Sequence, residues 1–109
     1  MVESNQLALD QVFHALADQS RRAMLARLAT DDLSVGELAA PLAMSLAAAS
    51  KHVKVLEKAG LIDRRVRGRV HICRLSTRPL AAASGWLKHY ETFWAESLDR
   101  LSDLFGEEE

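Results

Sequence analysis

Four residues in the middle of the chain share the spacing of one helix face and are suited to binding a polyanion. Ala47, Ser50, Lys51 and Lys54 recur at three- and four-residue steps within a predicted helix from about residue 46 to residue 59. A serine hydroxyl can donate to a base edge or a phosphate, and lysine ammonium groups bind phosphates or guanine. Small side chains at the start of the face would let the helix enter the major groove of DNA. Because alanines and lysines also occur on any soluble helix, the surroundings of this face must support the interpretation.

Charged residues are unevenly distributed along the 109-residue chain, whose formal net charge is only −1. Residues 51–78 contain nine Lys and Arg and two Asp and Glu, a net charge of +7. The remaining residues contain five basic and thirteen acidic side chains, a net charge of −8. This polarity places the positive field in one region, as in proteins that bind nucleic acid, although a solvated basic face has the same composition.

No motif in the sequence indicates catalysis. A glycine-rich phosphate loop, a nucleophile motif and a pair of acidic residues in a definable pocket are all absent from it. The segment "VRGRV" has the pattern of a hairpin turn rather than of a nucleotide-binding loop. We therefore expect a protein that is not an enzyme and that has no cofactor.

Helical periodicity and capping residues predict three helices before the basic segment. Asp18 can cap a second helix, "QSRRAMLARLA". Ser34 and Glu37 have the spacing of a capping box and predict the start of a third helix, which Pro41 limits to about two turns. The first helix, over about residues 7–17, is predicted by four apolar residues at helical spacing: Leu9, Val12, Phe13 and Leu16.

The third helix and the segment that follows it have the dimensions of a helix-turn-helix followed by a β-hairpin. Ser45 and Gly60 frame the fourth helix as its N-cap and its C-terminal stop, and the join "LAMS" is short. Two β-branched runs, "LIDRRV" and "VHICRL", flank an "RGR" turn and predict the hairpin. Alternation places Cys73 and Arg74 on opposite faces of the second strand, without indicating which face is buried.

These elements predict a single domain over residues 1–109, mainly α with a small β-hairpin. The expected fold is a winged helix-turn-helix of about five helices plus a two-stranded wing. The last helix should run from about residue 79 to residue 105, with Pro79 in its first turn. Its apolar residues form a stripe wider than a terminal helix of a small domain usually needs: Leu80, Ala83, Trp86, Leu87, Tyr90, Phe93, Trp94, Leu98, Leu101, Leu104 and Phe105.

Three segments together resemble the ArsR-type (ArsR/SmtB-like) winged-helix repressors: "VFHALADQSRRAMLARL", "LSVGELAAPLAMSLAAASKHVKVLEKAGLI" and "RRVRGRVHICRL". The resemblance covers roughly residues 8–100. It implies a homodimer that binds a palindromic operator in double-stranded DNA and represses its own or a neighbouring operon. It also implies that Ala47, Ser50 and Lys51 contact DNA from the recognition helix, and Arg67 and Arg69 from the wing tip.

The expected DNA-binding residues combine that implication with the basic charges around it: Ser45, Ala47, Ser50, Lys51, Lys54, Arg64, Arg65, Arg67 and Arg69. In the family, the first and last helices form the dimer, which would account for the wide apolar stripe. The expected interface residues are Leu9, Val12, Phe13, Trp86, Leu87, Tyr90, Phe93, Trp94, Leu98 and Leu101. Many relatives have a proline or a polar residue where this chain has Ala47, so the operator sequence cannot be predicted from the family.

Metal sites of the family's two kinds are not supported by the residues present. One kind needs a Cys-x-Cys-type pair on the third helix, where "SVGELAAP" has no cysteine, histidine or aspartate. The other needs ligands on the last helix, where His89 and Glu96 are about two turns apart and too distant to share one ion. We expect no metal site, a buried structural Cys73, a partly packed His52 and a His71 in the wing.

Two alternatives share the predicted fold. One is a repressor switched by a metal or a small ligand, and the other is a protein-interaction module whose aromatic last helix binds another partner. The second usually lacks a basic recognition face, which this chain has. We also expect a cytoplasmic protein without a membrane segment, because no apolar run reaches ~20 residues and the lone cysteine cannot form an internal disulfide.

Overall fold

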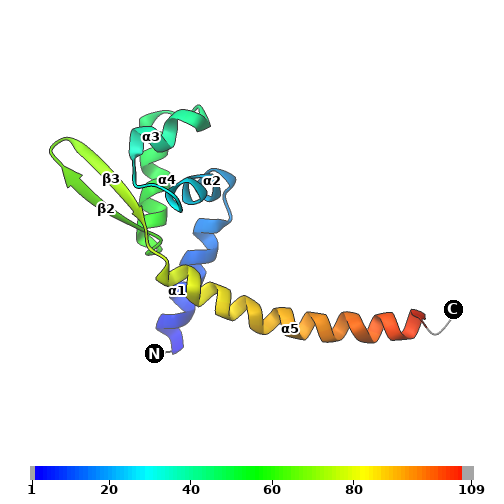
Figure 1. Ribbon diagram of the computed structural model, residues 1–109. Helices are drawn as coiled ribbons and strands as arrows, with labels where there is room; N and C mark the ends of the chain where they lie inside the picture. The colour runs from blue at the N-terminus through cyan, green and yellow to red at the C-terminus, as the bar shows by residue number, and fades with distance from the viewer. Residues whose placement is uncertain (1, 107–109) are drawn as a thin grey trace.

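The computed structural model describes the backbone of residues 2–106 and the surroundings of the side chains of residues 8–104. Five α-helices, one 3₁₀ helix and three short strands follow one another along the chain (Figure 1). This confirms the winged helix-turn-helix. In chain order they are α1 (Val2–Leu16), α2 (Gln19–Leu28), β1 (Leu33–Ser34), α3 (Val35–Ala39), η1 (Ala40–Leu42), α4 (Leu46–Lys58), β2 (Ile62–Arg67), β3 (Val70–Leu75) and α5 (Arg78–Gly106).

The predicted caps begin the helices, because each offers a side-chain acceptor to a backbone N–H that has no partner inside the helix. The backbone N–H of Arg21 donates to Asp18 Oδ2 at 3.0 Å, and α2 begins there. Ser34 and Glu37 form the complete capping box of α3. After α4, Gly60 adopts a φ of +77°, the left-handed conformation that glycine accepts readily.

The join between α3 and α4 contains the 3₁₀ helix η1, which the sequence did not predict. Pro41 does not end the helical path, because it lies at the start of the 3₁₀ helix η1, where its missing N–H is not needed. Together α3 and η1 make the two turns expected of the third helix. The turn itself is made at Ala43, whose φ of +52° is left-handed, and the chain then enters α4 at the Ser45 N-cap.

The wing belongs to an antiparallel sheet with strand order β1-β3-β2. In the β2–β3 hairpin, the register runs from Ile62 opposite Leu75 to Arg67 opposite Val70. The turn therefore contains two residues, Gly68 and Arg69, instead of the three expected. Gly68 has a φ of +64°, which a tight hairpin turn requires. The strand β1 was not predicted, and it adds a third strand by pairing with Ile72 and Cys73 in the middle of β3.

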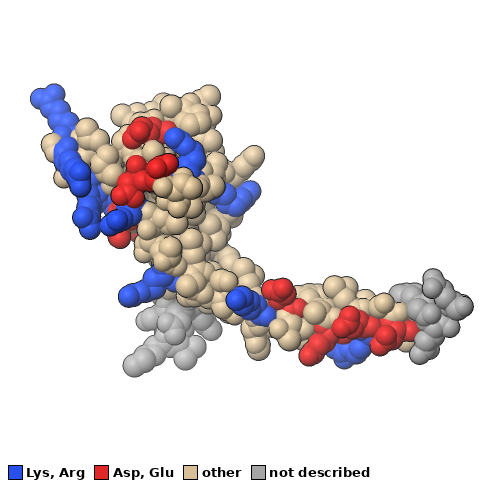
Figure 2. All heavy atoms as spheres, viewed as in Figure 1, with Lys and Arg blue, Asp and Glu red and all other residues tan. Residues whose placement is uncertain are grey.

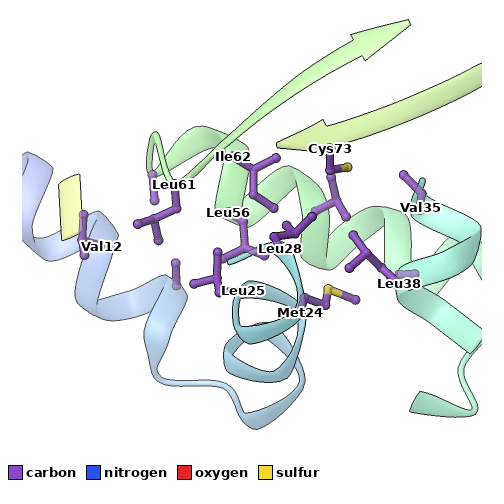
Figure 3. Packing of buried hydrophobic residues seen from close by; sticks show 14 of the residues in the cluster. Val12, Met24, Leu25, Leu28, Val35, Leu38, Leu56, Leu61, Ile62 and Cys73 are labelled. Atoms are coloured by element: carbon purple, nitrogen blue, oxygen red, sulfur yellow. The ribbon is translucent and has the colours of Figure 1, made fainter. Parts of the chain in front are cut away.

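The core lies where the helices α1 to α4 meet the inner half of the hairpin, and Figure 3 shows its side chains pointing toward one another. Cys73 is completely buried there, as expected, and this settles that its face of β3 is the inward one. Burial raises the pKa of the Cys73 thiol, so the residue behaves as a small apolar side chain. The largest fully buried side chains are Met24, Leu38, Leu56, Leu61, Ile62, Val53 and Cys73.

The helix α5 extends far beyond this core as a single arm (Figure 1). Its first turns pack against α1 and bury Ala83, but no other described element lies beside its outer half. The described chain measures 66 × 36 × 21 Å, and its radius of gyration is 18.5 Å. A compact domain of this length would have a radius of gyration of about 13 Å. No described helix is long and apolar enough to cross a membrane.

Candidate nucleic-acid interface

The helix α4 divides into a buried face and an exposed face, as its sequence predicted. Ala49, Val53 and Leu56 are completely buried against the core. On the other side, Ala47, Lys51 and Lys54 are exposed, and Ser50 is half-buried at the edge between the two faces. The structure therefore presents a small and basic surface that is held in place by the opposite side of the same helix.

Ser45 lies at the exposed start of α4 and contributes to its geometry. Its Oγ accepts the backbone N–H of Ala48 at 3.1 Å, which leaves the hydroxyl hydrogen free to donate to another group. The remaining N–H groups of the first turn point away from the helix and carry the positive end of its dipole. The N-terminus of α4 is thus suited to a phosphate beside it.

The arginines of the wing separate into two faces and a tip. Arg65 and Arg67 are exposed on the outer face of β2, opposite the helices, where Arg74 of β3 is also exposed. Arg69 is exposed in the turn, and so reaches furthest from the core. Arg74 pairs loosely with Asp32, at 3.7 Å between exposed atoms. In Figure 2, Lys and Arg atoms accordingly gather over the hairpin.

Arg64 differs from the other wing arginines, because its side chain lies on the inner face and is only 17% exposed. Its Nη2 donates to Glu57 Oε1 at 2.6 Å and its Nε to Glu57 Oε2 at 3.4 Å. The Arg64 charge is therefore paired within the subunit, and its expected contact with DNA stays a prediction. The two-point contact fixes the wing against α4, because a planar guanidinium facing a carboxylate restricts both partners.

A hollow of about 480 Å³ separates the N-terminal end of α4 from the wing. Three elements line it: α4 through Leu46 and Ser50, the start of α3 through Ser34, Val35 and Gly36, and the hairpin through Arg64, Arg69, Val70 and His71. The hollow therefore has polar donors along its walls and apolar side chains between them. His71 is an exposed wing residue, as predicted.

A second set of contacts joins α4 to the corner between α1 and α2, and the sequence did not predict it. Arg21 donates through Nε to the carbonyl of Ala15 at 2.7 Å and through Nη2 to that of His14 at 3.0 Å, which satisfies the end of α1. Its Nη1 lies 3.2 Å from His52 Nδ1, and Asp18 Oδ2 lies 3.8 Å from the same nitrogen. His52 is thus partly packed, as predicted, and joins α4 to the α1–α2 corner.

Asp18 shows the electrostatic effect of this corner. The backbone N–H of Arg21 lowers the pKa of the Asp18 carboxyl, and the nearby His52 and Arg21 side chains lower it further. Among the residues whose side chains are described, no group of three His, Cys, Asp or Glu is placed to hold a metal ion. His89 packs its ring edge-on against Tyr90, with 5.7 Å between ring centroids.

The expected dimer-interface residues lie on two helices that meet near Trp86. Phe13 of α1 contacts Trp86 edge-to-face, with 5.5 Å between ring centroids, and Tyr90 follows Trp86 at 4.5 Å. Leu9 and Phe13 are half-buried beside the core. Val12 differs from the rest of the set, because it faces the core of its own subunit and is 3% exposed. The others are between 43% and 60% exposed: Trp86, Leu87, Tyr90, Phe93, Trp94, Leu98 and Leu101.

Comparisons with known proteins agree with this architecture. A family model described as a helix-turn-helix domain matches residues 16–65. The chain is similar to the HTH-type transcriptional regulator Rv2034 of Mycobacterium tuberculosis, at 39% identity over 91% of this chain and 90% of that protein. It is similar to the transcriptional repressor SdpR of Bacillus subtilis, at 27% identity over 75% of this chain and 91% of that protein.

A crystal structure of an ArsR family transcriptional regulator, RHA00566, matches with a TM-score of 0.77 and 38% identity, over 83% of this chain and 93% of that one. The likeness thus extends over most of both chains. The chain belongs to the ArsR family of winged helix-turn-helix transcriptional regulators.

Proposed function

We propose that this protein binds a palindromic operator in double-stranded DNA as a homodimer and represses transcription from it. The observation that supports this most directly is the exposed small and basic face of α4, which lies beside an arginine-rich wing. The name of its relative SdpR, a transcriptional repressor, is consistent with the proposal. Occupying a promoter with a compact dimer is sufficient for repression.

In the proposed complex, the N-terminal half of α4 enters the major groove. Ala47 allows close approach, Ser50 donates to a base edge or a phosphate, and Lys51 and Lys54 bind phosphates or guanine. Ser45 donates its free hydroxyl hydrogen to the backbone at the rim of the groove. The backbone of one strand crosses the hollow between α4 and the wing, so that Arg69 reaches the adjacent minor groove.

The exposed stripe of α5 supports the homodimer. Soluble monomers rarely expose a continuous apolar surface of this kind, and a second copy of the same helix offers a matching one. A two-fold dimer would place two recognition helices about 34 Å apart, one turn of DNA, and this spacing requires a palindromic site.

The number of basic side chains allows the salt dependence of binding to be estimated. The proposal assigns phosphate contacts to five exposed cations in each subunit: Lys51, Lys54, Arg65, Arg67 and Arg69. If all ten in a dimer do so, log K falls with log salt concentration at a slope of about −9. Doubling the salt concentration should then weaken binding by about 500-fold.

The test is a fluorescence-anisotropy titration of the full chain against the DNA upstream of its own gene and against fragments selected from its genome. Competitor-resistant binding with a steep salt dependence would support the proposal, as would increased expression of the adjoining promoter when the gene is deleted. Failure to enrich any genomic fragment over random DNA would refute it. Added zinc or a chelator should have no effect, whereas loss of binding with zinc would support the metal-switched alternative.

A further inference from the structure

Leu46 is an apolar side chain in an unusual position, because it is the first residue of α4 and is 62% exposed. The surrounding surface is otherwise suited to a polyanion, with Ser45 before it and Lys51 further along the exposed face. The first residues of a recognition helix are those that meet base edges in the major groove. An exposed leucine here is therefore directed at the part of the ligand that carries sequence information.

Single exposed leucines are common on protein surfaces and need no explanation by themselves. Leu46 is not isolated, since it lines the hollow beside the wing together with Ser50 and Val70. The other apolar residue beside Leu46 in this lining is Val35 at the start of α3, whereas the exposed side chain of Val70 lies with Arg67 on the outer face of the hairpin. The chain thus builds a small apolar recess next to the polar groups that are suited to DNA.

Thymine is the only base that presents an apolar group to the major groove, its C5-methyl. We propose that Leu46 is a specificity-determining residue that contacts the methyl group of one thymine in each half-site, beside the hydrogen bonds made by Ser50. This inference rests on the proposed function and deepens it, because it assigns a base to a residue that carries no hydrogen-bonding group. Burying one methyl-sized group strengthens binding about fourfold, and two half-sites give about 15-fold.

The test begins with the best binding site that the full-length protein selects from a random-sequence DNA library. Each thymine of that site is then replaced symmetrically by deoxyuridine, which removes only the methyl group. At one position we expect wild-type binding to weaken by about 15-fold, the effect of two methyl groups. At that position the Leu46→Ala variant should bind the thymine and deoxyuridine sites equally, within a factor of two.

Two further variants serve as controls. Leu46→Met keeps an apolar side chain of similar volume and should retain the response to deoxyuridine. Val66→Ala removes an equally exposed apolar side chain, 62%, from the wing and should also retain it. Because Leu46 is exposed, its truncation opens no cavity, and thermal unfolding should confirm that each variant is folded.

The outcomes separate this inference from the proposed function. If the library yields no enriched site, the proposed function fails and the inference fails with it. If a site is enriched but no deoxyuridine replacement weakens wild-type binding, the inference alone is overturned. The same conclusion follows if the replacement weakens wild type and Leu46→Ala by equal factors, because the methyl group is then read by another residue.

Discussion

Replacing Leu101 by alanine should weaken self-association while leaving the subunit folded. Leu101 lies on the outer half of α5, at helical spacing from Trp94 and Leu98, and it is 50% exposed. Ala83 on the same face is buried against the core, so the face that α5 turns toward its own domain continues outward as the exposed stripe. The outer part of that face has no described partner within the subunit (Figure 1).

The size of the effect follows from the area that a partner would cover. Complete burial of a leucine side chain stabilises by about 1.5–3 kcal/mol, and half of that area remains exposed at Leu101. Covering it contributes about 0.75–1.5 kcal/mol in each subunit, and two-fold symmetry doubles this to about 1.5–3 kcal/mol per dimer. The dissociation constant of the dimer should therefore rise by about 10- to 150-fold.

Sedimentation equilibrium over a range of protein concentrations measures this constant directly. The matched control is Thr92→Ala, on the opposite face of the same helix, where the hydroxyl donates only to the carbonyl of Lys88 at 3.2 Å. That control should leave the dissociation constant unchanged. A Leu101→Ala protein that is folded and self-associates as tightly as wild type would refute the assignment of the stripe to a second copy of this chain.

Five other substitutions test separate parts of the structure. Lys54→Ala should weaken binding to all DNA sequences about equally and make the slope of log K against log salt concentration shallower by about two per dimer. Ser50→Ala should instead change the order of preferred sites. Titrations of several sequences at several salt concentrations measure both effects. Arg64→Met should lower the free energy of unfolding by about 1 kcal/mol in urea denaturation, because it breaks the partly buried pair with Glu57. Arg74→Met should change that free energy by about zero, because Arg74 and Asp32 are both exposed. Asp18→Ala should lower the free energy of unfolding by about 1 kcal/mol at neutral pH through loss of the α2 cap. Folding lowers the pKa of Asp18 below its ordinary 3.8. The stability that the ionised carboxylate contributes is therefore complete above that pH and is lost as the pH falls through the folded-state pKa. Unfolding of wild type and of Asp18→Ala should accordingly differ less at acid pH than at neutral pH.

Local signals in the sequence were sufficient to locate the helix-turn-helix. Asp18, Ser45 and Gly60 mark the ends of their helices because each acts within a few residues along the chain. The exposed and buried faces of α4 follow from a period of 3.6 residues, which also depends only on neighbouring positions. These features could be predicted because no distant part of the chain is needed to produce them.

Three of the features that were missed involve pairs of residues from different elements. The strand β1 exists only because Leu33 pairs with Cys73, and two residues carry no strand signal of their own. The pair between Arg64 and Glu57 was not predicted, because Arg64 is one of several arginines in its strand and only the fold brings it beside Glu57. The contact between Arg21 and His52 joins elements 31 positions apart. Such pairs are decided by packing, which periodicity does not describe.

These long-range contacts explain how one framework can carry different DNA specificities. The middle of α4 is held by His52 at the α1–α2 corner, and its end is held to the wing through Glu57. Its first turn is fixed by the Ser45 cap and by the buried Ala49, whereas the side chains of Leu46 and Ala47 are exposed. Substitutions there can alter base contacts without disturbing the core, because the residues that position the helix lie elsewhere.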